Sequence, residues 1–345
     1  MGNILEVDGL QVSFQGGDDH KTPRLTVLDN ISFNLAKGRV LGLVGESGCG
    51  KSVTSMAIMR LLPQPSGQID QGRIIYQPDT TATDLLQLPY DAMRQIRGRK
   101  IAMIFQEPMT ALNPVQTVGR QLREVFSLHF PQRQATEVHQ ASVQLLEQVG
   151  IPAPEQRLKE YPHQLSGGMR QRVVIAIALA GEPEILIADE PTTALDVTIQ
   201  HQILMLIKQL QHERNMSVIF ITHDLGVVAQ MCDDVAVMYA GRIVEQAPVA
   251  ALFARPRHPY TQGLLASIPR LDDQPKQTLQ IIPGQVPALT DLPSGCRFRN
   301  RCIHAQADCA TQAPALETTE TAHQVACLYW DTLSPVHSAV NEVIQ

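Results

Sequence analysis

The sequence lacks an apolar run long enough to cross a membrane. Its longest apolar segment, residues 173–180, ends at Gly181, whereas a membrane-spanning helix needs about 20 apolar residues. We therefore predict that the chain does not cross a bilayer. The first residues also lack the basic and apolar regions of a secretion signal, and Glu6 interrupts the myristoylation pattern. These absences favour a cytosolic location, with membrane contact through a protein partner.

Positive charge is not in excess either. The chain has 28 Lys and Arg against 34 Asp and Glu, which gives a formal net charge of −6 at pH 7. A protein that binds nucleic acid usually concentrates basic residues on one face, where they neutralise phosphates. No stretch of this sequence is strongly basic, so we expect no nucleic-acid partner.

Cysteine is scarce and unevenly placed. Of the six cysteines, four lie late in the chain: Cys296, Cys302, Cys309 and Cys327. Disulfides are rare in the cytosol, so free thiols or a metal centre are the alternatives. Nine of the 23 prolines also fall within the last 90 residues, which predicts irregular structure from about residue 256 onward.

The chain is organised around a glycine-rich turn. Residues 40–44 are apolar and predict a buried parallel strand, and residues 51–62 have the apolar spacing of a helix. Between them, glycines let several backbone N–H groups converge on one anion. The turn comprises Gly45, Glu46, Ser47, Gly48, Cys49, Gly50, Lys51 and Ser52. It predicts a nucleotide-phosphate site in which Lys51 reaches the β- and γ-phosphates and Ser52 binds Mg²⁺.

Segments before and after the glycine-rich turn predict an antiparallel sheet. Residues 4–14, 25–33 and 73–77 alternate between apolar and polar side chains, which is typical of antiparallel strands. Phe14 ends one of these strands. Its ring either stacks on a bound adenine base or packs in the core.

A short apolar segment at residues 101–105 predicts another buried strand. Gln106 follows it, where a side-chain amide can coordinate a metal or position water, or can simply cap the surface. From about residue 115 the apolar spacing becomes that of helices. We therefore predict an inserted helical subdomain at about residues 108–164.

A second candidate anion site begins at Ser166. The Ser166 hydroxyl can cap a helix whose first residues, Gly167 and Gly168, leave their N–H groups exposed. An ordinary capped helix start is the alternative.

Two more predicted strands end in polar side chains. Residues 184–189 end in Asp189, which Glu190 follows, and residues 217–222 are followed by His223. The carboxyl ends of parallel strands meet at one edge of a sheet. There Asp189 would hold Mg²⁺, Glu190 would polarise an attacking water and His223 would contact the γ-phosphate. Solvated carboxylates and a surface histidine are the alternatives.

Together these motifs resemble those of one family. Residues 45–52 resemble a Walker A motif, Gln106 the Q-loop, residues 165–169 the ABC signature, residues 185–190 a Walker B motif, residues 194–196 the D-loop, and His223 the switch histidine. Over about residues 1–255 the chain resembles the nucleotide-binding subunit of an ABC transporter. The resemblance implies an ATPase that uses ATP and Mg²⁺. It also implies an α/β fold with a RecA-like P-loop NTPase core, an antiparallel β-subdomain and an inserted α-helical subdomain.

Finer features resemble the ATPases of oligopeptide and dipeptide importers, a subfamily that also serves nickel and glutathione importers. They are residues 106–114, 192–198 and 258–261, and a four-cysteine extension at residues 256–345. The resemblance implies two transmembrane permease subunits, an extracytoplasmic substrate-binding protein, and a location at the cytoplasmic face of the inner membrane. A soluble, non-transport ABC ATPase is the alternative. The single Walker A motif and the lack of sustained heptads disfavour it.

The second anion site implies a second ATPase subunit, identical or paralogous. Ser166 follows the phosphate turn by about 115 residues and has no phosphate of its own. Two subunits arranged head to tail would each place Ser166, Gly167 and Gly168 against the ATP held by the other. ATP would then close the dimer, and hydrolysis would release it.

The four late cysteines predict a bound metal. Four thiolates suit either tetrahedral Zn²⁺ or a [4Fe-4S] cluster. Their spacing lacks the tight cysteine pair usual for zinc, and Arg297, Arg299 and Arg301 would offset the negative charge of a cluster. We therefore predict a structural iron–sulfur cluster. Zn²⁺ and unliganded thiols are the alternatives, with His304 and His323 as possible substitute ligands.

Overall fold

The computed structural model describes residues 2–16, 23–106, 111–193, 195–268, 281–319 and 322–333. Residues 107–110 and Ala194 belong to motifs quoted above but lie outside the described residues, as do residues 334–345. In the described part of the chain, no helix combines the length and the apolar character that a membrane span requires.

Two sheets form the centre of the described chain. The smaller is antiparallel, with the order β2-β1-β4-β5. Its strands are β1 (Asn3–Gln15), β2 (Arg24–Ala36), β4 (Gly67–Tyr76) and β5 (Thr83–Asp84). These strands agree with the alternation of apolar and polar residues in the sequence. They bury one apolar face, as such alternation requires.

The larger sheet has the order β11-β12-β10-β9-β3-β8-β7-β6. Its strands are β3 (Val40–Val44), β6 (Ile101–Ile104), β7 (Ile185–Asp189), β8 (Ser217–Thr222), β9 (Asp234–Tyr239), β10 (Arg242–Pro248), β11 (Glu317–Thr318) and β12 (Gln324–Val325). The run from β9 to β6 is parallel. Every residue of β3, β7 and β8 is buried, because a parallel sheet is covered on both faces.

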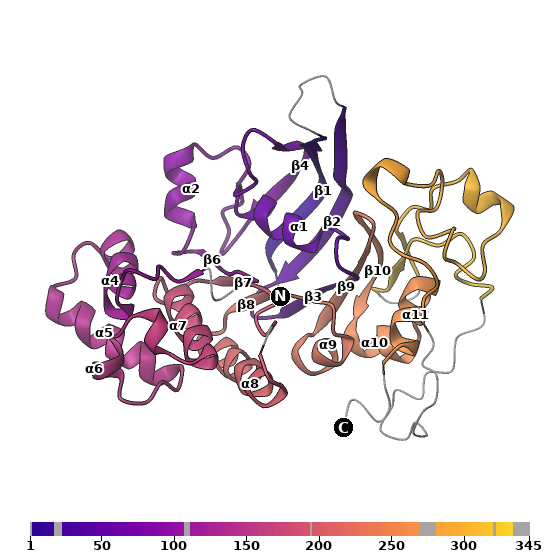
Figure 1. Ribbon diagram of the computed structural model, residues 1–345. Coiled ribbons are helices and arrows are strands. Elements are labelled where there is room, and N and C mark those ends of the chain that lie inside the picture. The colour runs from indigo at the N-terminus through magenta and orange to yellow at the C-terminus, as the bar shows by residue number, and fades with distance from the viewer. Residues whose placement is uncertain are drawn as a thin grey trace.

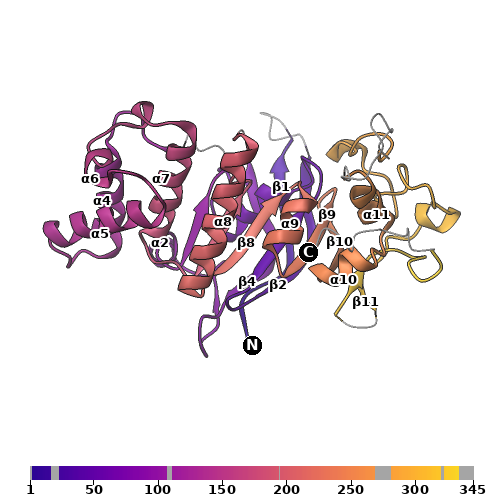
Figure 2. The ribbon, with the colours of Figure 1, turned by 90° about the horizontal axis from the view of Figure 1, so that it is seen from below.

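Helices surround these sheets. They are α1 (Lys51–Ile58), α2 (Tyr90–Ile96), α4 (Val118–His129), α5 (Ala135–Gln148), α6 (Pro154–Arg157), α7 (Gly167–Leu179), α8 (Val197–Arg214), α9 (Leu225–Met231), α10 (Val249–Ala254) and α11 (Pro259–Ala266), with short 3-10 turns at Pro162–Gln164, Leu289–Asp291 and Ala307–Ala310. Figures 1 and 2 show α4, α5 and α6 gathered at one end of the larger sheet and α11 at the other.

Local sequence explains where the helices of the first end begin. The Thr117 hydroxyl accepts a hydrogen bond from the Arg120 N–H at 3.3 Å and so caps α4. The Glu137 carboxylate accepts one from the Gln134 N–H at 2.7 Å at the start of α5. The described residues from 118 to 164 contain helices and turns but no strand. The exact limits of a helical subdomain, and of an extension beginning at residue 256, remain predictions.

The described residues beyond 255, which we call the C-terminal region, join the larger sheet through a buried carboxylate. Glu245 in β10 is fully buried and accepts hydrogen bonds from the N–H groups of Arg257 at 2.6 Å and His258 at 3.0 Å. The His323 ring lies 2.7 Å from the same carboxylate. β12 pairs with β10 beside it. This contact secures an irregular segment to the edge of the sheet.

Candidate nucleotide-binding and catalytic site

The phosphate turn joins β3 to α1 and has a positive φ, which favours glycine, at three positions: Gly45, Gly48 (+79°) and Gly50. Gly45 has φ +154° and Gly50 has φ +105°. A Cβ atom at Gly45 would lie 2.2 Å from the Met238 carbonyl oxygen, and one at Gly50 would lie 2.6 Å from Leu28 Cδ2. At Gly48, by contrast, a Cβ would meet no atom within 4 Å. The turn is therefore packed tightly on one side and open at Gly48, as an anion cradle must be.

Lys51 lies over this turn. Its side chain is 5% exposed, and the ammonium group donates hydrogen bonds to the carbonyl oxygens of Gly45 at 2.8 Å and Glu46 at 3.1 Å. These contacts hold the ammonium group close to the turn, where we predict that it meets the β- and γ-phosphates. Cys49 is buried, and burial raises the pKa of its thiol. It therefore fills space as a neutral side chain.

Ser52 and Asp189 lie together at the carboxyl ends of β3 and β7. Ser52 lies near the Asp189 carboxylate and offsets part of the effect of burial on its pKa, and Asp189 is 3% exposed. Asp189 Oδ1 is buried and has no hydrogen-bond partner. Hydroxyl and carboxylate oxygens are the ligands that Mg²⁺ prefers, so an unpaired carboxylate oxygen beside Ser52 fits the predicted Mg²⁺ position. Burial, with a smaller contribution from the charge of Glu190, raises the pKa of Asp189.

Glu190 brings three strand ends together. Gln106, after β6, donates from Nε2 to Glu190 Oε2 at 3.2 Å. His223, after β8, places Nδ1 3.2 Å from Glu190 Oε1. Thr193 donates from its hydroxyl to Glu190 Oε2 at 3.0 Å. The structure thus brings the three predicted catalytic residues, Gln106, Glu190 and His223, into direct contact.

The surroundings of Glu190 keep it ionised. Burial on its own would raise its pKa, but hydrogen bonds from His223 and Thr193, with the charges of His223 and Lys51, outweigh burial and lower the pKa. A carboxylate held in this way can accept a proton from water. The contact from Thr193 was absent from the sequence prediction. The only sequence signal for it is a hydroxyl three residues after the glutamate.

The Gln106 amide is hydrogen-bonded to Glu190 in this structure. Its predicted role as a Mg²⁺ ligand therefore remains a prediction. For Phe14, stacking on a bound adenine base and packing in the core both remain predictions. Phe14 is partly buried, pairs with Gly67 across β1 and β4, and packs against the core of the smaller sheet.

The second candidate anion site starts α7. Ser166 caps this helix, and its hydroxyl accepts a hydrogen bond from the Met169 N–H at 3.3 Å. A Cβ at Gly167 would meet no atom within 4 Å, whereas one at Gly168 would lie 3.0 Å from Ile199 Cγ2. The helix start is therefore open on the side of Gly167.

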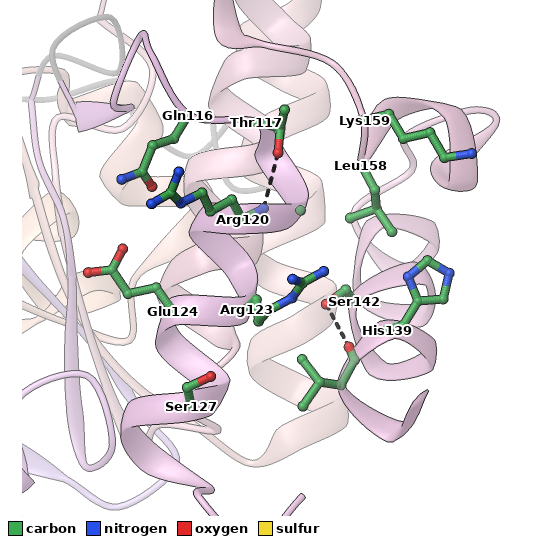
Figure 3. Close-up of a pocket in the computed structure, with 12 residues that line it drawn as sticks. Gln116, Thr117, Arg120, Arg123, Glu124, Ser127, His139, Ser142, Leu158 and Lys159 are labelled. Carbon is green, nitrogen blue, oxygen red and sulfur yellow. Dashed lines mark hydrogen bonds between the residues drawn. The ribbon is translucent and has the colours of Figure 1, made fainter. Parts of the chain in front are cut away.

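A cavity of about 990 Å³ lies away from these residues, between α4 and α5. Figure 3 shows Arg120, Arg123 and Glu124 on α4 and His139 on α5 around it. It contains neither a phosphate turn nor the end of a sheet strand. We therefore assign the candidate site to the strand ends and not to this cavity.

The replacement of Asp189 by Asn tests the magnesium position. We expect Mg²⁺ affinity in ATP hydrolysis to fall by about 10–100-fold, the size of effect that metal-site partners produce. Because burial raises the pKa of Asp189, its charge destabilises the fold at neutral pH, so the melting temperature should not fall. The same raised pKa means that Mg²⁺ affinity should weaken as the pH is lowered toward it.

The measurement is a Mg²⁺ titration of ATPase activity at fixed ATP, with thermal unfolding of the same samples. Asp234→Asn is the matched control, since Asp234 begins β9 and pairs with Arg39 at 3.0 Å. An unchanged Mg²⁺ requirement in Asp189→Asn would contradict the assignment.

The four late cysteines do not form the predicted metal site. All are free thiols, and burial raises the pKa of Cys327 to about 11. Among the described residues, which include all four cysteines, no three His, Cys, Asp or Glu side chains are grouped to hold a metal ion. The predicted iron–sulfur cluster is therefore wrong, and the zinc alternative has no ligand group either. His323 is engaged with Glu245.

Side-chain packing provides structural support of the kind that the sequence led us to expect from an iron–sulfur cluster. The rings of Tyr239 and Tyr260 lie 4.8 Å apart, and Phe298 lies 5.1 Å and 5.4 Å from them. All three rings are buried. This aromatic group and the Glu245 contacts hold the C-terminal region against the larger sheet.

Two family models match the chain. The model described as "ABC transporter" matches residues 28–193, and "Oligopeptide/dipeptide transporter, C-terminal region" matches residues 244–309. The first match covers the phosphate turn, Ser166 and Glu190. The second covers most of the described C-terminal region.

Curated relatives match along nearly the whole chain. A putative peptide import ATP-binding protein of Brucella abortus (strain 2308) is 48% identical over 96% of this chain and 98% of its own length. The oligopeptide transport ATP-binding protein OppD of Bacillus subtilis (strain 168) is 49% identical over 93% of this chain and 87% of its own length.

Solved structures agree on the fold. The ATP-binding cassette MJ0796, in a dimeric post-hydrolysis state bound to ADP and Pi, has a TM-score of 0.60 and 27% identity. The match covers 71% of this chain and 98% of that one. The α/β fold is thus that of an ATP-binding cassette. The chain belongs to the ATP-hydrolysing subunits of ABC transporters, in the branch with an oligopeptide/dipeptide transporter C-terminal region.

Proposed function

We propose that this chain powers the import of dipeptides or oligopeptides through a membrane ABC transporter complex by hydrolysing ATP. The proposal that the chain hydrolyses ATP rests on the contacts that Gln106, Thr193 and His223 make with Glu190. The names of the relatives, peptide import and oligopeptide transport ATP-binding proteins, support peptide as the cargo.

Each site residue has a proposed task in hydrolysis. The N–H groups of residues 45–52 and the Lys51 ammonium bind the phosphates of ATP. Ser52 and Asp189 would hold Mg²⁺, which would neutralise charge on the phosphates of ATP. Glu190 takes a proton from the attacking water, and His223 holds Glu190 in place and contacts the γ-phosphate.

We place a second ATPase subunit opposite the start of α7. Ser166, Gly167 and Gly168 would bind the γ-phosphate of ATP that this second subunit holds, through N–H groups at a helix N-terminus. The open space beside Gly167 supports this placement. The second subunit is either a copy of this chain or a paralogue.

The remaining partners follow from the role of an import motor. Two transmembrane permease subunits would hold this chain at the cytoplasmic face of the inner membrane, and an extracytoplasmic protein would deliver the peptide to them. We propose that α4, α5 and α6 face the permease, since they form the end of the molecule opposite the C-terminal region (Figure 1). Closure of the ATPase dimer would reach the permease through these helices and Gln106.

Reconstitution tests this function. The complex would be purified with its permease and receptor, placed in vesicles, and assayed for ATP-dependent uptake of labelled di- and oligopeptides, Ni²⁺ and glutathione. We expect uptake of peptides, and loss of uptake in a complex with Glu190→Gln. Uptake of Ni²⁺ or glutathione but not peptides would overturn the cargo, and uptake independent of ATP would overturn the role.

A further inference from the structure

Glu46, inside the phosphate turn, is ion-paired to the C-terminal region. Arg301 donates from Nη1 to Glu46 Oε2 at 2.6 Å and from Nη2 to Glu46 Oε1 at 3.0 Å. The Arg301 side chain is 5% exposed and that of Glu46 is 32% exposed. Arg301 is itself fixed, because its Nε donates to the Pro283 carbonyl oxygen at 2.9 Å. A two-bond contact of this kind fixes orientation as well as charge.

A second contact fixes the backbone of the same residue. The Glu46 N–H donates to the Tyr260 hydroxyl at 2.9 Å. Tyr260 belongs to α11 and is fully buried between Tyr239 and Phe298. The hydroxyl therefore has little freedom to move away from the turn.

A third contact reaches the other side of the turn through a neighbouring loop. Arg297 donates to the Ala240 carbonyl oxygen at 2.5 Å and is ion-paired to Asp29. The adjacent Gly241 N–H donates to the Cys49 carbonyl oxygen at 3.0 Å. The C-terminal region thus holds the turn at Glu46 directly and at Cys49 through residues 240–241.

We expect these contacts to affect ATP binding, because Glu46 and the phosphates of ATP are both negatively charged. Glu46 is an anion inside a turn that binds the anionic phosphates, so an unpaired Glu46 would repel the nucleotide. Arg301 neutralises it. We propose that Arg301 and Tyr260 are positioning residues of the ATP site, through which the C-terminal region sets the affinity of the phosphate turn for ATP. This rests on the proposed function only in that residues 45–52 bind ATP.

Equilibrium binding of MgATP to the full-length chain, measured by titration calorimetry, tests the pair. We expect Arg301→Ala to raise the Kd about tenfold, or ~1.4 kcal/mol, because it leaves Glu46 charged and unpaired. Adding Glu46→Gln to Arg301→Ala should restore the Kd to within about twofold of the wild type. A purely structural role for Arg301 would show no such rescue. Arg299→Ala is the matched control, since Arg299 contacts Ser294 and Ala310.

Tyr260→Phe keeps the inference testable if Arg301→Ala fails to fold. It removes one hydroxyl and keeps the ring packing, and we expect the Kd to rise about 2- to 10-fold. In the assembled transporter, both single variants should raise KM for ATP and leave kcat nearly unchanged. A wild-type Kd in Tyr260→Phe, or no rescue by Glu46→Gln in a folded Arg301→Ala chain, would overturn the inference. Failure of peptide uptake alone would overturn only the cargo.

Discussion

Replacement of Glu190 by Gln is expected to slow ATP hydrolysis by about 10²–10⁴-fold, the contribution of a general base. Gln can still accept hydrogen bonds from Gln106 and Thr193 but cannot take a proton from water. The phosphate turn, Lys51 and Asp189 are unchanged, so MgATP should still bind. Because ATP is then held without being cleaved, the variant should remain in the ATP-bound, closed dimer.

The measurement is steady-state phosphate release by the assembled complex, alongside MgATP binding to the isolated chain. Glu213→Gln is a suitable control, since Glu213 is an exposed carboxylate on α8 that accepts a hydrogen bond from Gln209 at 2.7 Å. Turnover close to that of the wild type, in a complex whose other ATP site is inactive, would remove Glu190 from the mechanism.

The pKa of Glu190 adds a pH test. Hydrogen bonds and nearby positive charge lower that pKa from an ordinary value of 4.5. The carboxylate therefore stays ionised as the pH falls from neutral toward 4.5, and its own titration should cause no loss of activity in that range. A loss of ATPase activity at mildly acidic pH that disappears in Glu190→Gln would contradict this electrostatic account.

Most of the candidate catalytic site could be predicted from sequence, because its residues follow the ends of parallel strands. Gln106, Glu190 and His223 each follow an apolar run that forms a buried parallel strand. Parallel strands deliver their carboxyl ends to one edge of a sheet whatever the side-chain packing. The apolar runs and the residues after them were therefore sufficient to predict that these groups meet.

Contacts between distant segments could not be predicted in this way. Arg301 lies 255 positions from Glu46, and Tyr260 lies 214 positions from it. No periodicity or motif links residues so far apart, because their meeting depends on how the C-terminal region packs. The cysteines show the same limit, since spacing along the chain counts thiols but does not give the directions in which they point.

Replacement of Ser166 by Arg is expected to reduce ATP hydrolysis by the assembled complex to background. The long, charged side chain would project from the start of α7 into the space where we place the ATP of the second subunit. The phosphate turn of the same chain has its contacts with Lys51, Tyr260 and Arg301, none of which involves Ser166. MgATP should therefore bind the isolated chain with an unchanged Kd.

Three comparisons separate this explanation from damage to the helix. Gln209→Arg adds the same side chain at an exposed position on α8 and should leave turnover intact. Ser166→Ala removes only the cap, which stabilises the helix by about 1 kcal/mol, so it should cost stability more than turnover. Gly167→Ala should keep or raise the melting temperature, since its Cβ meets no atom within 4 Å and Ala favours a helix, yet it should lower turnover.

A mixing experiment is decisive when the second ATPase subunit is a copy of this chain. One subunit with Ser166→Arg and one with Lys51→Ala would both damage the same ATP site and leave the other site whole. Both changes in one subunit, paired with a wild-type subunit, would damage both sites. Separate changes should therefore retain turnover at one site and combined changes should lose it. Equal turnover in the two mixtures, or full activity in Ser166→Arg alone, would show that α7 of one subunit does not complete the ATP site of the other.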